Sequence, residues 1–382
     1  MRILIICGAG YISGKEKVMF SLLKGFAKEE IIVNCITSTW GNGQFENLLV
    51  SEKISFSKVR LGFISKTLNW KAIRMTIEQA FYWPKLLYDY CKIIAAFKPD
   101  VVIHSNFHHL FLLYPVINSK KEIHIYHCHE SINNSKFYKK LFRYFSNKIT
   151  KFIGVSDFVS KRMVELGIKE SKVKTIHNGL EIGVQAQEFK QGIESEIFKV
   201  GIVGQIVPWK GHECLFEAIR ILKNAISPEQ IRISVFGNGD EVFVKKLQSI
   251  LEQRKISEYV IWEGFKNKLT DIYKDLDLVC LPTLSEEPFG LSAIEPGIFA
   301  IPVIVTKQGG LPEIVEHGYN GFVIDSSNAD QLAHYILQLI NKKELSKEMG
   351  KNHQKVVFQK FTFQQFMENW MLLVSENITN RN

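Results

Sequence analysis

The chain has 382 residues, of which 46% are hydrophobic and 23% charged, and its formal net charge at pH 7 is +9. These values exclude a disordered or fibrous protein, and the length predicts two domains of roughly 150 to 200 residues each. No apolar run approaches the roughly 18 to 20 residues of a membrane span, and the first residues lack the apolar stretch of a signal peptide, so we expect a cytoplasmic location.

The first half of the chain alternates β-rich runs with helical stretches. Strands are predicted at residues 3–7, 31–37, 101–104, 123–126 and 152–155, with a helix at about 15–27 after the first of them. Such alternation is typical of βαβ units, in which a parallel sheet is covered by helices on both faces. Residues 1–185 are therefore predicted to form an α/β domain of the doubly wound kind.

The second half repeats this style after a polar stretch at 181–196, which we interpret as a linker. Its predicted strands are residues 199–204, 231–236, 260–263, 278–282, 302–306 and 321–324. A second α/β domain is therefore expected at residues 195–355, followed by helical residues. Ligands of such sheets bind at the carboxyl ends of the strands, so the chemistry is expected there.

The loop at residues 8–14 follows a strand and precedes a helix, and it contains three glycines. A dinucleotide fingerprint needs this context, but Ser13 takes the place of the third glycine and no acidic residue ends the second strand. A nicotinamide-dependent oxidoreductase is therefore disfavoured. The loop can still present backbone N–H groups to a phosphate; a tight turn without chemical importance is the alternative.

The segment from Glu287 to Glu295 carries the strongest indication of function. A loop after a strand turns into a helix near Gly290, so the backbone N–H groups of residues 289–292 can receive a diphosphate. Glu295, one turn into the helix, can bind ribose hydroxyls, and Glu287 can reach hydroxyls of a sugar beyond the phosphates. A helix-start acid and a surface acid are the simpler alternatives.

With these residues the chain resembles the retaining GT-B glycosyltransferases that carry the E-x7-E motif, also called glycosyltransferase family 4 or group 1. The matching segments are 203–205, 210–211, 236–239, 263–265, 281–283, 287–295, 309–313 and 318–321, and in the first half 98–104, 155–156 and 177–179. The resemblance implies two Rossmann-like domains with a cleft between them. It implies acceptor binding by residues 1–185, nucleotide-sugar binding by 195–355, and a last helix, about 360–382, that packs on the first domain.

The resemblance also implies roles for individual residues in a site that needs no metal or cofactor. Lys210 would neutralise the leaving diphosphate, Glu287 would bind the donor sugar and Glu295 the ribose. The other donor-binding residues that it implies are Gly14, Lys15, Gln205, Gly237, Asn238, Gly264, Phe265, Pro288, Phe289, Gly290 and Leu291.

Two positions depart from the family pattern. Gln205 stands where the family usually has an arginine, and a neutral amide cannot offset phosphate charge. Lys15 follows Gly14 where the family tends to have a second glycine. Our hypothesis is that Lys15 partly replaces the missing arginine. Gln205 also keeps open a catalytically silent subunit that binds a sugar or a lipid surface.

Two histidines complete the set of candidate catalytic residues. His127 and His129 lie at the end of a predicted strand, where the family commonly has a histidine that touches the donor sugar. The sequence does not decide which of the two does so. A structural role or a metal-ligand role are the alternatives, and no third ligand is evident.

The distribution of charged residues predicts binding partners, and the spacing of the cysteines predicts their redox state. Residues 54–98 hold eight Lys or Arg against two acids, with aromatic residues between them, and residues 136–151 hold six Lys or Arg and no acid. Such stretches suit an anionic surface at the inner face of the membrane; solvated helix faces are the alternative. No nucleic-acid module accompanies the charge, so no nucleic acid partner is expected. The six cysteines lack zinc-site spacing, which predicts reduced thiols.

The function predicted from the whole sequence is transfer of a hexose, with retention, from a UDP- or GDP-linked donor to a saccharide or lipid-linked acceptor. Assembly of a cell-surface polysaccharide or glycolipid is the expected setting, by analogy with the family. The retaining course follows from the resemblance, which implies that the leaving diphosphate takes the proton of the acceptor on the same face of the sugar.

Overall fold

The computed structural model describes residues 1–8, 12–62, 70–182 and 197–381. The chain divides into two compact units, one of residues 1–178 with 364–382 and the other of residues 179–363. The predicted linker at 181–196 falls almost wholly outside the described residues, as does Gly10 of the first glycine loop. Both units are α/β, as predicted.

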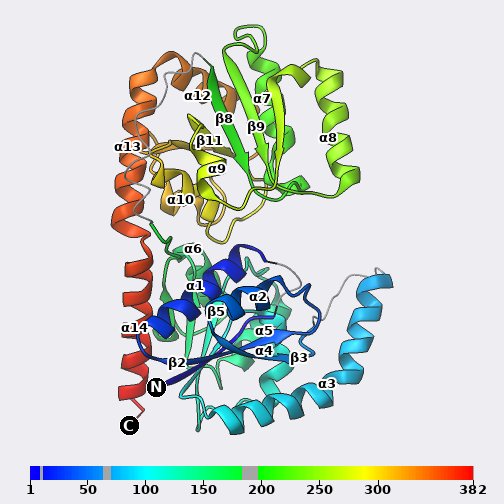
Figure 1. Cartoon of the computed structure of the whole chain (residues 1–382), viewed down its shortest axis with the longest axis vertical. Helices are drawn as coiled ribbons and strands as arrows, with labels where there is room; N and C mark the ends of the chain where they lie inside the picture. Colours follow the sequence, from blue (N-terminus) through cyan, green and yellow to red (C-terminus); the bar gives the residue numbers. More distant parts are fainter. Residues whose placement is uncertain (9–11, 63–69, 183–196, 382) are drawn as a thin grey trace. The chain divides into compact units, whose positions relative to one another are not determined.

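The first unit is built on a fully parallel sheet of seven strands (Figure 1). Their spatial order is β3 (Ser55–Val59), β2 (Ile32–Ser38), β1 (Arg2–Ile6), β4 (Val101–His104), β5 (Ile123–Cys128), β6 (Lys151–Gly154) and β7 (Val173–Thr175). The order reverses between β1 and β4, which is the switch point of a doubly wound sheet. The central strands β1 and β4 are buried on both faces, and they read as continuous apolar runs for that reason.

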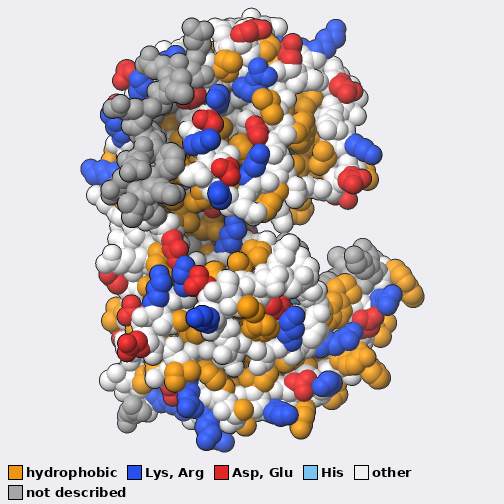
Figure 2. Space-filling view, in the orientation of Figure 1, with side chains coloured by type: hydrophobic (Ala, Val, Ile, Leu, Met, Phe, Trp, Pro, Cys, Tyr) orange, Lys and Arg blue, Asp and Glu red, His pale blue; other side chains and the backbone are white. Residues whose placement is uncertain are grey.

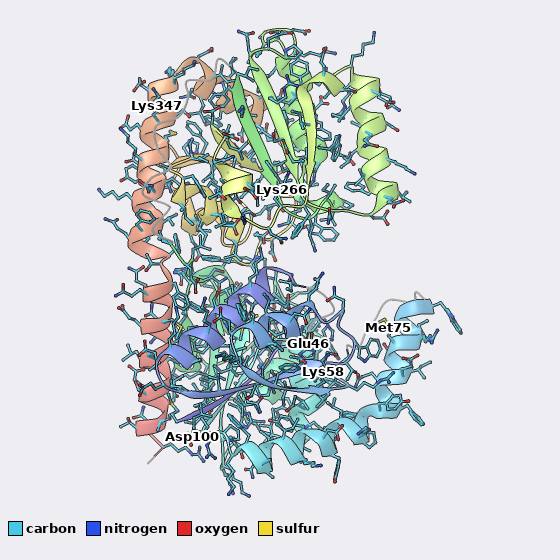
Figure 3. All side chains as sticks on the ribbon, viewed as in Figure 1. Glu46, Lys58, Met75, Asp100, Lys266 and Lys347 are labelled. Carbon is cyan, nitrogen blue, oxygen red and sulfur yellow. The ribbon has the colours of Figure 1, made fainter. Side chains whose placement is uncertain are left out.

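The helices of the first unit connect these strands and cover the sheet (Figure 1). They are α1 (Gly14–Lys28), α2 (Gln44–Ser51), α3 (Trp70–Phe97), α4 (Phe107–Leu113), α5 (Lys136–Phe145) and α6 (Asp157–Glu165). Polar contacts attach α2 to the β3 edge of the sheet: Glu46 of α2 accepts a hydrogen bond from Thr37 of β2 at 3.1 Å and pairs with Lys58 of β3 at 3.5 Å (Figure 3).

The second unit is built on a parallel sheet of six strands. Their order is β10 (Val260–Gly264), β9 (Ile231–Phe236), β8 (Phe198–Val203), β11 (Leu278–Leu281), β12 (Val303–Thr306) and β13 (Gly321–Ile324). Its helices are α7 (His212–Leu222), α8 (Glu241–Arg254), α9 (Leu269–Tyr273), α10 (Leu291–Ile298), α11 (Leu311–Ile314), α12 (Ala329–Asn341) and α13 (Lys343–Lys360). The switch point lies between β8 and β11.

The last helix, α14 (Phe363–Thr379), belongs almost entirely to the first unit, where it packs beside α1 (Figure 1). The buried ring of Trp370 meets Phe26 edge-on, with ring centroids 6.4 Å apart, and Met367 lies over Gly25. The Met367 side chain occupies the space that a Cβ atom at Gly25 would take, so the two helices approach closely at this glycine. Among the described helices, none is long and apolar enough to cross a bilayer.

Two strands of the first sheet escape the sequence prediction. β3 and β7 are edge strands, and β7 has only three residues. β3 contains two serines and a lysine and is buried only at its last residue, and β7 is partly exposed throughout, so neither has the continuous apolar run that marks a central parallel strand.

Removal of the Trp370 side chain is expected to destabilise the first unit. Trp370→Ala leaves a large cavity between α14 and α1 and should cost about 3 to 5 kcal/mol of unfolding free energy. The control is Leu372→Ala on the same helix, because Leu372 is half exposed. Urea unfolding followed by circular dichroism compares the two variants. Equal shifts of the unfolding midpoint would contradict the assigned packing of α14.

Candidate functional site

A pocket lies at the switch point of the second sheet, where ligands of doubly wound sheets bind. It is bounded by the carboxyl ends of β8 and β11 and by the loops that follow them. The residues that line it are Ile202, Val203, Gly204, Lys210, His212, Leu281, Thr283, Glu287, Gly290, Ser292 and Leu311. Three of the predicted site residues, Lys210, Glu287 and Gly290, are therefore brought together here.

The loop that carries Lys210 is attached to the loop after β11 through backbone contacts. The Trp209 carbonyl accepts hydrogen bonds from the hydroxyl of Thr283 at 2.8 Å and from the Leu284 N–H at 2.7 Å. Gly211 follows in the left-handed region, with φ of 79°. A Cβ atom at Gly211 would collide with the Pro282 carbonyl, so only glycine permits this approach. Lys210 is thereby placed at the pocket by a rigid turn.

Lys210 forms an ion pair with Glu287, with Nζ 2.5 Å from Oε2. Both side chains are mostly buried, which strengthens the attraction relative to an exposed pair. The Glu287 carbonyl accepts a hydrogen bond from the Gly310 N–H at 2.8 Å, and a Cβ atom at Gly309 would collide with the Glu287 backbone. The two charged side chains therefore stand on loops whose backbones contact each other, and the Glu287 loop also contacts the loop before α11.

The amino end of α10 supplies backbone N–H groups to the same pocket. Gly290 precedes the helix in the left-handed region, with φ of 101°, and Leu291 is the first helical residue. The first N–H groups of a helix have no partner within it and carry partial positive charge. Phe289 is buried, with its ring 5.6 Å from that of Phe361, so its side chain anchors the turn. Pro288 has no N–H to offer.

Glu295 lies on α10, one turn beyond its start, and is held by a buried tyrosine. The Tyr273 hydroxyl at the end of α9 donates a hydrogen bond of 2.6 Å to Oε2 of Glu295. Burial raises the pKa of Tyr273 well above its usual range, and the neighbouring Glu295 carboxylate adds to this rise. Tyr273 therefore remains a neutral donor. The sequence does not point to Tyr273, because 22 residues separate the partners.

His212 is a pocket residue that the sequence analysis passed over. It is the first residue of α7, its side chain is 1% exposed, and neither ring nitrogen has a hydrogen-bond partner among the described residues. Burial lowers the pKa of His212 to about 4, and the Lys210 charge contributes, so the ring is neutral at pH 7. A neutral imidazole carries one N–H donor. The signal that could have found it is its place after Lys210 and Gly211, at a helix start.

Five other predicted donor residues surround the carboxyl edge of the sheet without lining the pocket. Gln205 follows β8 and is exposed, and Gly237 follows β9 so close to Gly204 that a Cβ atom would collide with the Gly204 carbonyl. Asn238 is exposed beside it, Gly264 ends β10 with φ of 70°, and Phe265 is exposed next in the chain. An exposed aromatic ring at a strand end can stack on a flat ligand. Their roles in donor binding stay predictions.

In the first unit, Gly14 and Lys15 begin α1 at the switch point of the seven-stranded sheet. The Ser13 N–H donates to the Glu16 carboxylate at 3.0 Å, and the Lys15 ammonium pairs with the other oxygen of Glu16 at 3.0 Å. Lys15 is mostly buried, so its charge is held in place by Glu16. Its proposed part in donor binding stays a prediction.

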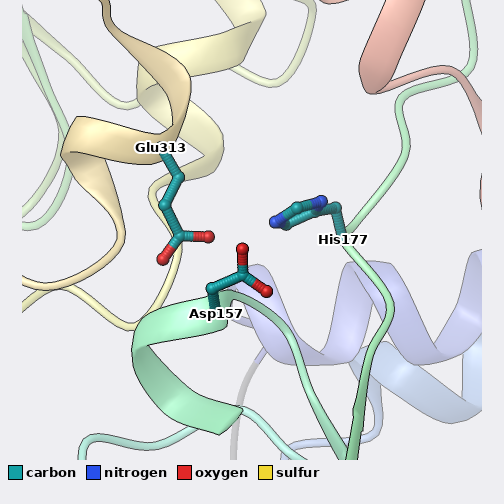
Figure 4. Close-up of side chains that lie close together, drawn as sticks. All are labelled: Asp157, His177 and Glu313. Atoms are coloured by element: carbon teal, nitrogen blue, oxygen red, sulfur yellow. The ribbon is translucent and has the colours of Figure 1, made fainter. Parts of the chain in front are cut away.

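Polar side chains also follow the other strands of this sheet. Asn106, the N-cap of α4, donates to Glu130 at 3.2 Å, and burial raises the pKa of Glu130. Asp157, at the start of α6, accepts a hydrogen bond of 2.6 Å from Thr175 at the end of β7, and His177 lies just beyond that strand (Figure 4). The carboxyl edge of the first sheet is therefore lined with hydrogen-bonding groups.

The two candidate histidines occupy different environments. β5 extends to Cys128, so His127 lies within the strand and not, as predicted from the sequence, just after it. The side chain of His127 is completely buried, and its ring centroid lies 4.9 Å from that of Trp370. Burial lowers the pKa of His127 to about 3. His129 lies beyond the strand, is partly exposed, and has Nε2 3.0 Å from Nδ1 of His127. A ligand can reach His129, whereas His127 can position its ring.

The chain thus consists of two doubly wound α/β units, and the second has a cation and a helix start at its switch point. The model for glycosyl transferases group 1 matches residues 184–356, and the model for glycosyltransferase family 4 matches residues 12–183. The chain belongs to this family, group 1 or family 4 of the glycosyltransferases.

Several curated relatives of the chain carry glycosyltransferase names. A glycosyltransferase of Methanocaldococcus jannaschii is 28% identical over 58% of this chain and 58% of its own length. The poly(ribitol-phosphate) alpha-N-acetylglucosaminyltransferase of Staphylococcus aureus is 25% identical over 66% of this chain and 49% of its own length. The chain thus spans about half to three fifths of these relatives.

Solved structures share the fold at low sequence identity. Anabaena HepE, in complex with UDP, superposes with a TM-score of 0.82 at 20% identity, over 98% of this chain and 100% of HepE. A variant of Staphylococcus aureus TarM, in complex with UDP and saccharide ligands, gives a TM-score of 0.73 at 16% identity, over 98% and 99% of the two chains. These likenesses establish two Rossmann-like domains of the GT-B type.

The pocket of the second unit is expected to bind inorganic pyrophosphate through Lys210. Lys210→Ala removes the cation and should weaken binding on the order of tenfold or more, because hydrogen bonds to charged groups are worth about 1.5 to 3 kcal/mol. Titration calorimetry measures the change. Lys266→Ala is the control, since Lys266 is a partly exposed lysine of the same unit paired with Glu263 (Figure 3). If Lys210→Ala bound pyrophosphate as tightly as the wild-type protein, the pocket would not be the anion-binding site.

Proposed function

We propose that this protein is a retaining glycosyltransferase that moves a hexose from a UDP- or GDP-linked donor to a saccharide or lipid-linked acceptor. The observation that carries the proposal is the ion pair of Lys210 and Glu287 in the pocket beside the amino end of α10. A cation and a helix start suit a diphosphate, and carboxylates suit the hydroxyls of a sugar and a ribose. This combination fits the donor of a family 4 enzyme.

Lys210 can bind the phosphates of the donor and keep its ion pair with Glu287. An ammonium group has three N–H donors, so the hydrogen bond to Glu287 leaves two of them for phosphate oxygens. The carboxylate of Glu287 retains lone pairs for the hydroxyls of the sugar. The neutral ring of His212 can add one N–H donor from the floor of the same pocket. Because these groups are already in place, little reorganisation accompanies transfer.

In the proposed reaction, the bond between the anomeric carbon and the diphosphate oxygen breaks first. Negative charge then grows on the diphosphate, where Lys210 and the N–H groups of Leu291 and Ser292 stabilise it. The departing oxygen takes the proton of the acceptor hydroxyl on the same face, and the acceptor oxygen bonds to the carbon from that face. The configuration is retained, Glu287 is a binding residue, and the proposal assigns no step to a metal or cofactor.

The proposed setting is assembly of a cell-surface polysaccharide or glycolipid on the cytoplasmic side of the membrane. A relative that supports it is a Staphylococcus aureus capsular polysaccharide biosynthesis glycosyltransferase, 24% identical over 60% of this chain. The predicted contact of residues 54–98 and 136–151 with an anionic membrane surface is part of the proposal, since a lipid-linked acceptor is presented there.

A panel of nucleotide sugars tests the donor class. A ligand at 100 times its Kd adds about 2.7 kcal/mol to the stability of the folded state, so the correct donor should raise the melting temperature clearly. Turnover with that donor should survive EDTA, and proton NMR of the product should show the anomeric configuration of the donor.

Each other outcome rejects a stated part of the proposal. An inverted product would refute retention, and loss of turnover in EDTA would refute metal independence. Donor binding without turnover would favour the silent binding subunit that Gln205 leaves open. If NAD but none of the nucleotide sugars stabilised the protein, the alternative function of a nicotinamide-dependent oxidoreductase would be favoured.

Tyr273 is expected to act as a positioning residue for Glu295. Tyr273→Phe removes the hydrogen bond that holds the carboxylate and should raise the KM for the donor about tenfold, with kcat little changed, because the ribose contact is the same in ground and transition states. Steady-state kinetics measure both. The matched control is Tyr259→Phe, whose hydroxyl donates at 2.9 Å to the Ile226 carbonyl. A loss of kcat at constant KM would contradict the role.

A further inference from the structure

Helix α3 carries a line of exposed apolar side chains along its outer face. Trp70, Ile77, Phe81 and Tyr88 are 81%, 64%, 78% and 68% exposed. Trp70, Ile77 and Phe81, spaced by seven and four residues, lie within about 20° of one line on a helix with 3.6 residues per turn. Pro84 lies inside α3 and the helix is bent (Figure 1), so Tyr88 extends the exposed apolar face beyond the proline. We name these four side chains the α3 stripe. Large apolar side chains gathered on one surface mark a binding surface, whereas single ones do not.

The opposite face of α3 is fastened to the first unit, so the stripe cannot turn inward. Gln79 is completely buried and accepts a hydrogen bond from the Gly62 N–H at 2.8 Å. The Arg60 guanidinium lies over the Tyr82 ring at 3.8 Å, and the Trp83 indole donates to the Leu112 carbonyl at 2.7 Å. These contacts fix the rotation of the helix about its axis.

Cations flank the stripe. Arg74, Lys85 and Lys92 are exposed. Arg74 lies about 40° from Trp70 around the helix before Pro84, and Lys85 and Lys92 lie about 60° and 40° from Tyr88 after it, in the same sense of rotation. Two acids lie farther round the helix, where Glu78 pairs with Arg74 at 2.9 Å and Asp89 with Lys85 at 3.0 Å. Figure 2 shows hydrophobic and basic side chains together along this helix. The side of the stripe that faces outward is therefore apolar and cationic.

The basic run at 136–151 contributes only in part to such a surface. Lys148 and Lys151 turn inward, to the Tyr114 carbonyl at 3.0 Å and the Ser171 carbonyl at 2.8 Å. On α5, an exposed arc remains that contains Lys136, Phe137, Lys140, Arg143 and Tyr144. Helix α4 packs against both α3 and α5, so all three helices belong to one layer of the unit.

We propose that the α3 stripe docks this protein on a bilayer that contains anionic lipid. The two aromatic rings that are most exposed, Trp70 and Phe81, enter the headgroup region, and Arg74, Lys85 and Lys92 meet the lipid phosphates. A single line of apolar residues edged by cations suits a helix lying in a membrane interface. The docking does not require sugar transfer, so it can be tested separately from the donor chemistry. It relates to the proposed function because a docked enzyme would meet a lipid-linked acceptor at the bilayer.

Vesicle co-sedimentation of the full chain, without nucleotide sugar, tests the proposal. Binding is expected to vesicles with about one third phosphatidylglycerol, to fall at high salt, and to be weak on phosphatidylcholine alone. Trp70→Ser/Phe81→Ser should weaken binding on the order of tenfold or more. Lys85→Gln/Lys92→Gln should weaken it about tenfold at low salt. The matched control is Val242→Ser/Lys245→Gln on α8, where Val242 is 77% exposed.

A second measurement tests the proposal on the wild-type protein, in case a variant of the α3 stripe folds poorly. Brominated lipids should quench the fluorescence of the wild-type protein, and Trp70→Phe should lose a large part of that quenching while still binding vesicles. Stripe variants should also keep donor turnover with a free saccharide acceptor, which separates failure of this proposal from failure of the proposed function.

Three results would overturn the assignment. One is binding to anionic vesicles that the stripe variant and the α8 control weaken equally. Another is no binding to anionic vesicles at all. The last is a dimer, seen by light scattering, that Trp70→Ser/Phe81→Ser dissociates while vesicles remain unbound, since a second copy of the chain would then cover the stripe.

Discussion

The candidate site of the second unit depends on the close approach of loop backbones at glycines. Gly211 lets the loop after β8 touch the Pro282 carbonyl, and Gly309 lets the loop before α11 touch the backbone of Glu287. Any side chain at these positions would collide with main-chain atoms, which cannot move aside as a flexible side chain can. Backbone rigidity of this kind is what brings Lys210 and Glu287 to 2.5 Å.

This arrangement fixes the charges of the pocket residues before a ligand binds. An ammonium that is mostly removed from water is costly unless an opposite charge compensates it, and Glu287 supplies that charge. The pair thus keeps a cation ready at the start of α10. His212 remains neutral chiefly because burial lowers its pKa, and the neighbouring Lys210 charge adds to this effect. The pocket therefore holds one cation paired with one carboxylate, together with neutral hydrogen-bonding groups.

The central strands, the Lys210 and Glu287 motifs and the turn at Gly290 could be predicted from the sequence because each rests on local spacing. The edge strands β3 and β7 could not, since they lack apolar runs. Contacts across the fold also escape prediction. Tyr273 of α9 meets Glu295 of α10 across a separation of 22 residues, and His127 is withdrawn from ligands because it lies within β5 against Trp370 of the last helix.

The return of α14 to the first unit has a consequence for the order of folding. The first unit needs Trp370 to fill its core, yet this residue is synthesised after the whole of the second unit. During translation the second unit can therefore complete its fold while α1 still exposes the apolar surface that α14 later covers. The first unit, although its strands come first in the chain, can therefore complete its core only after the last helix has been synthesised.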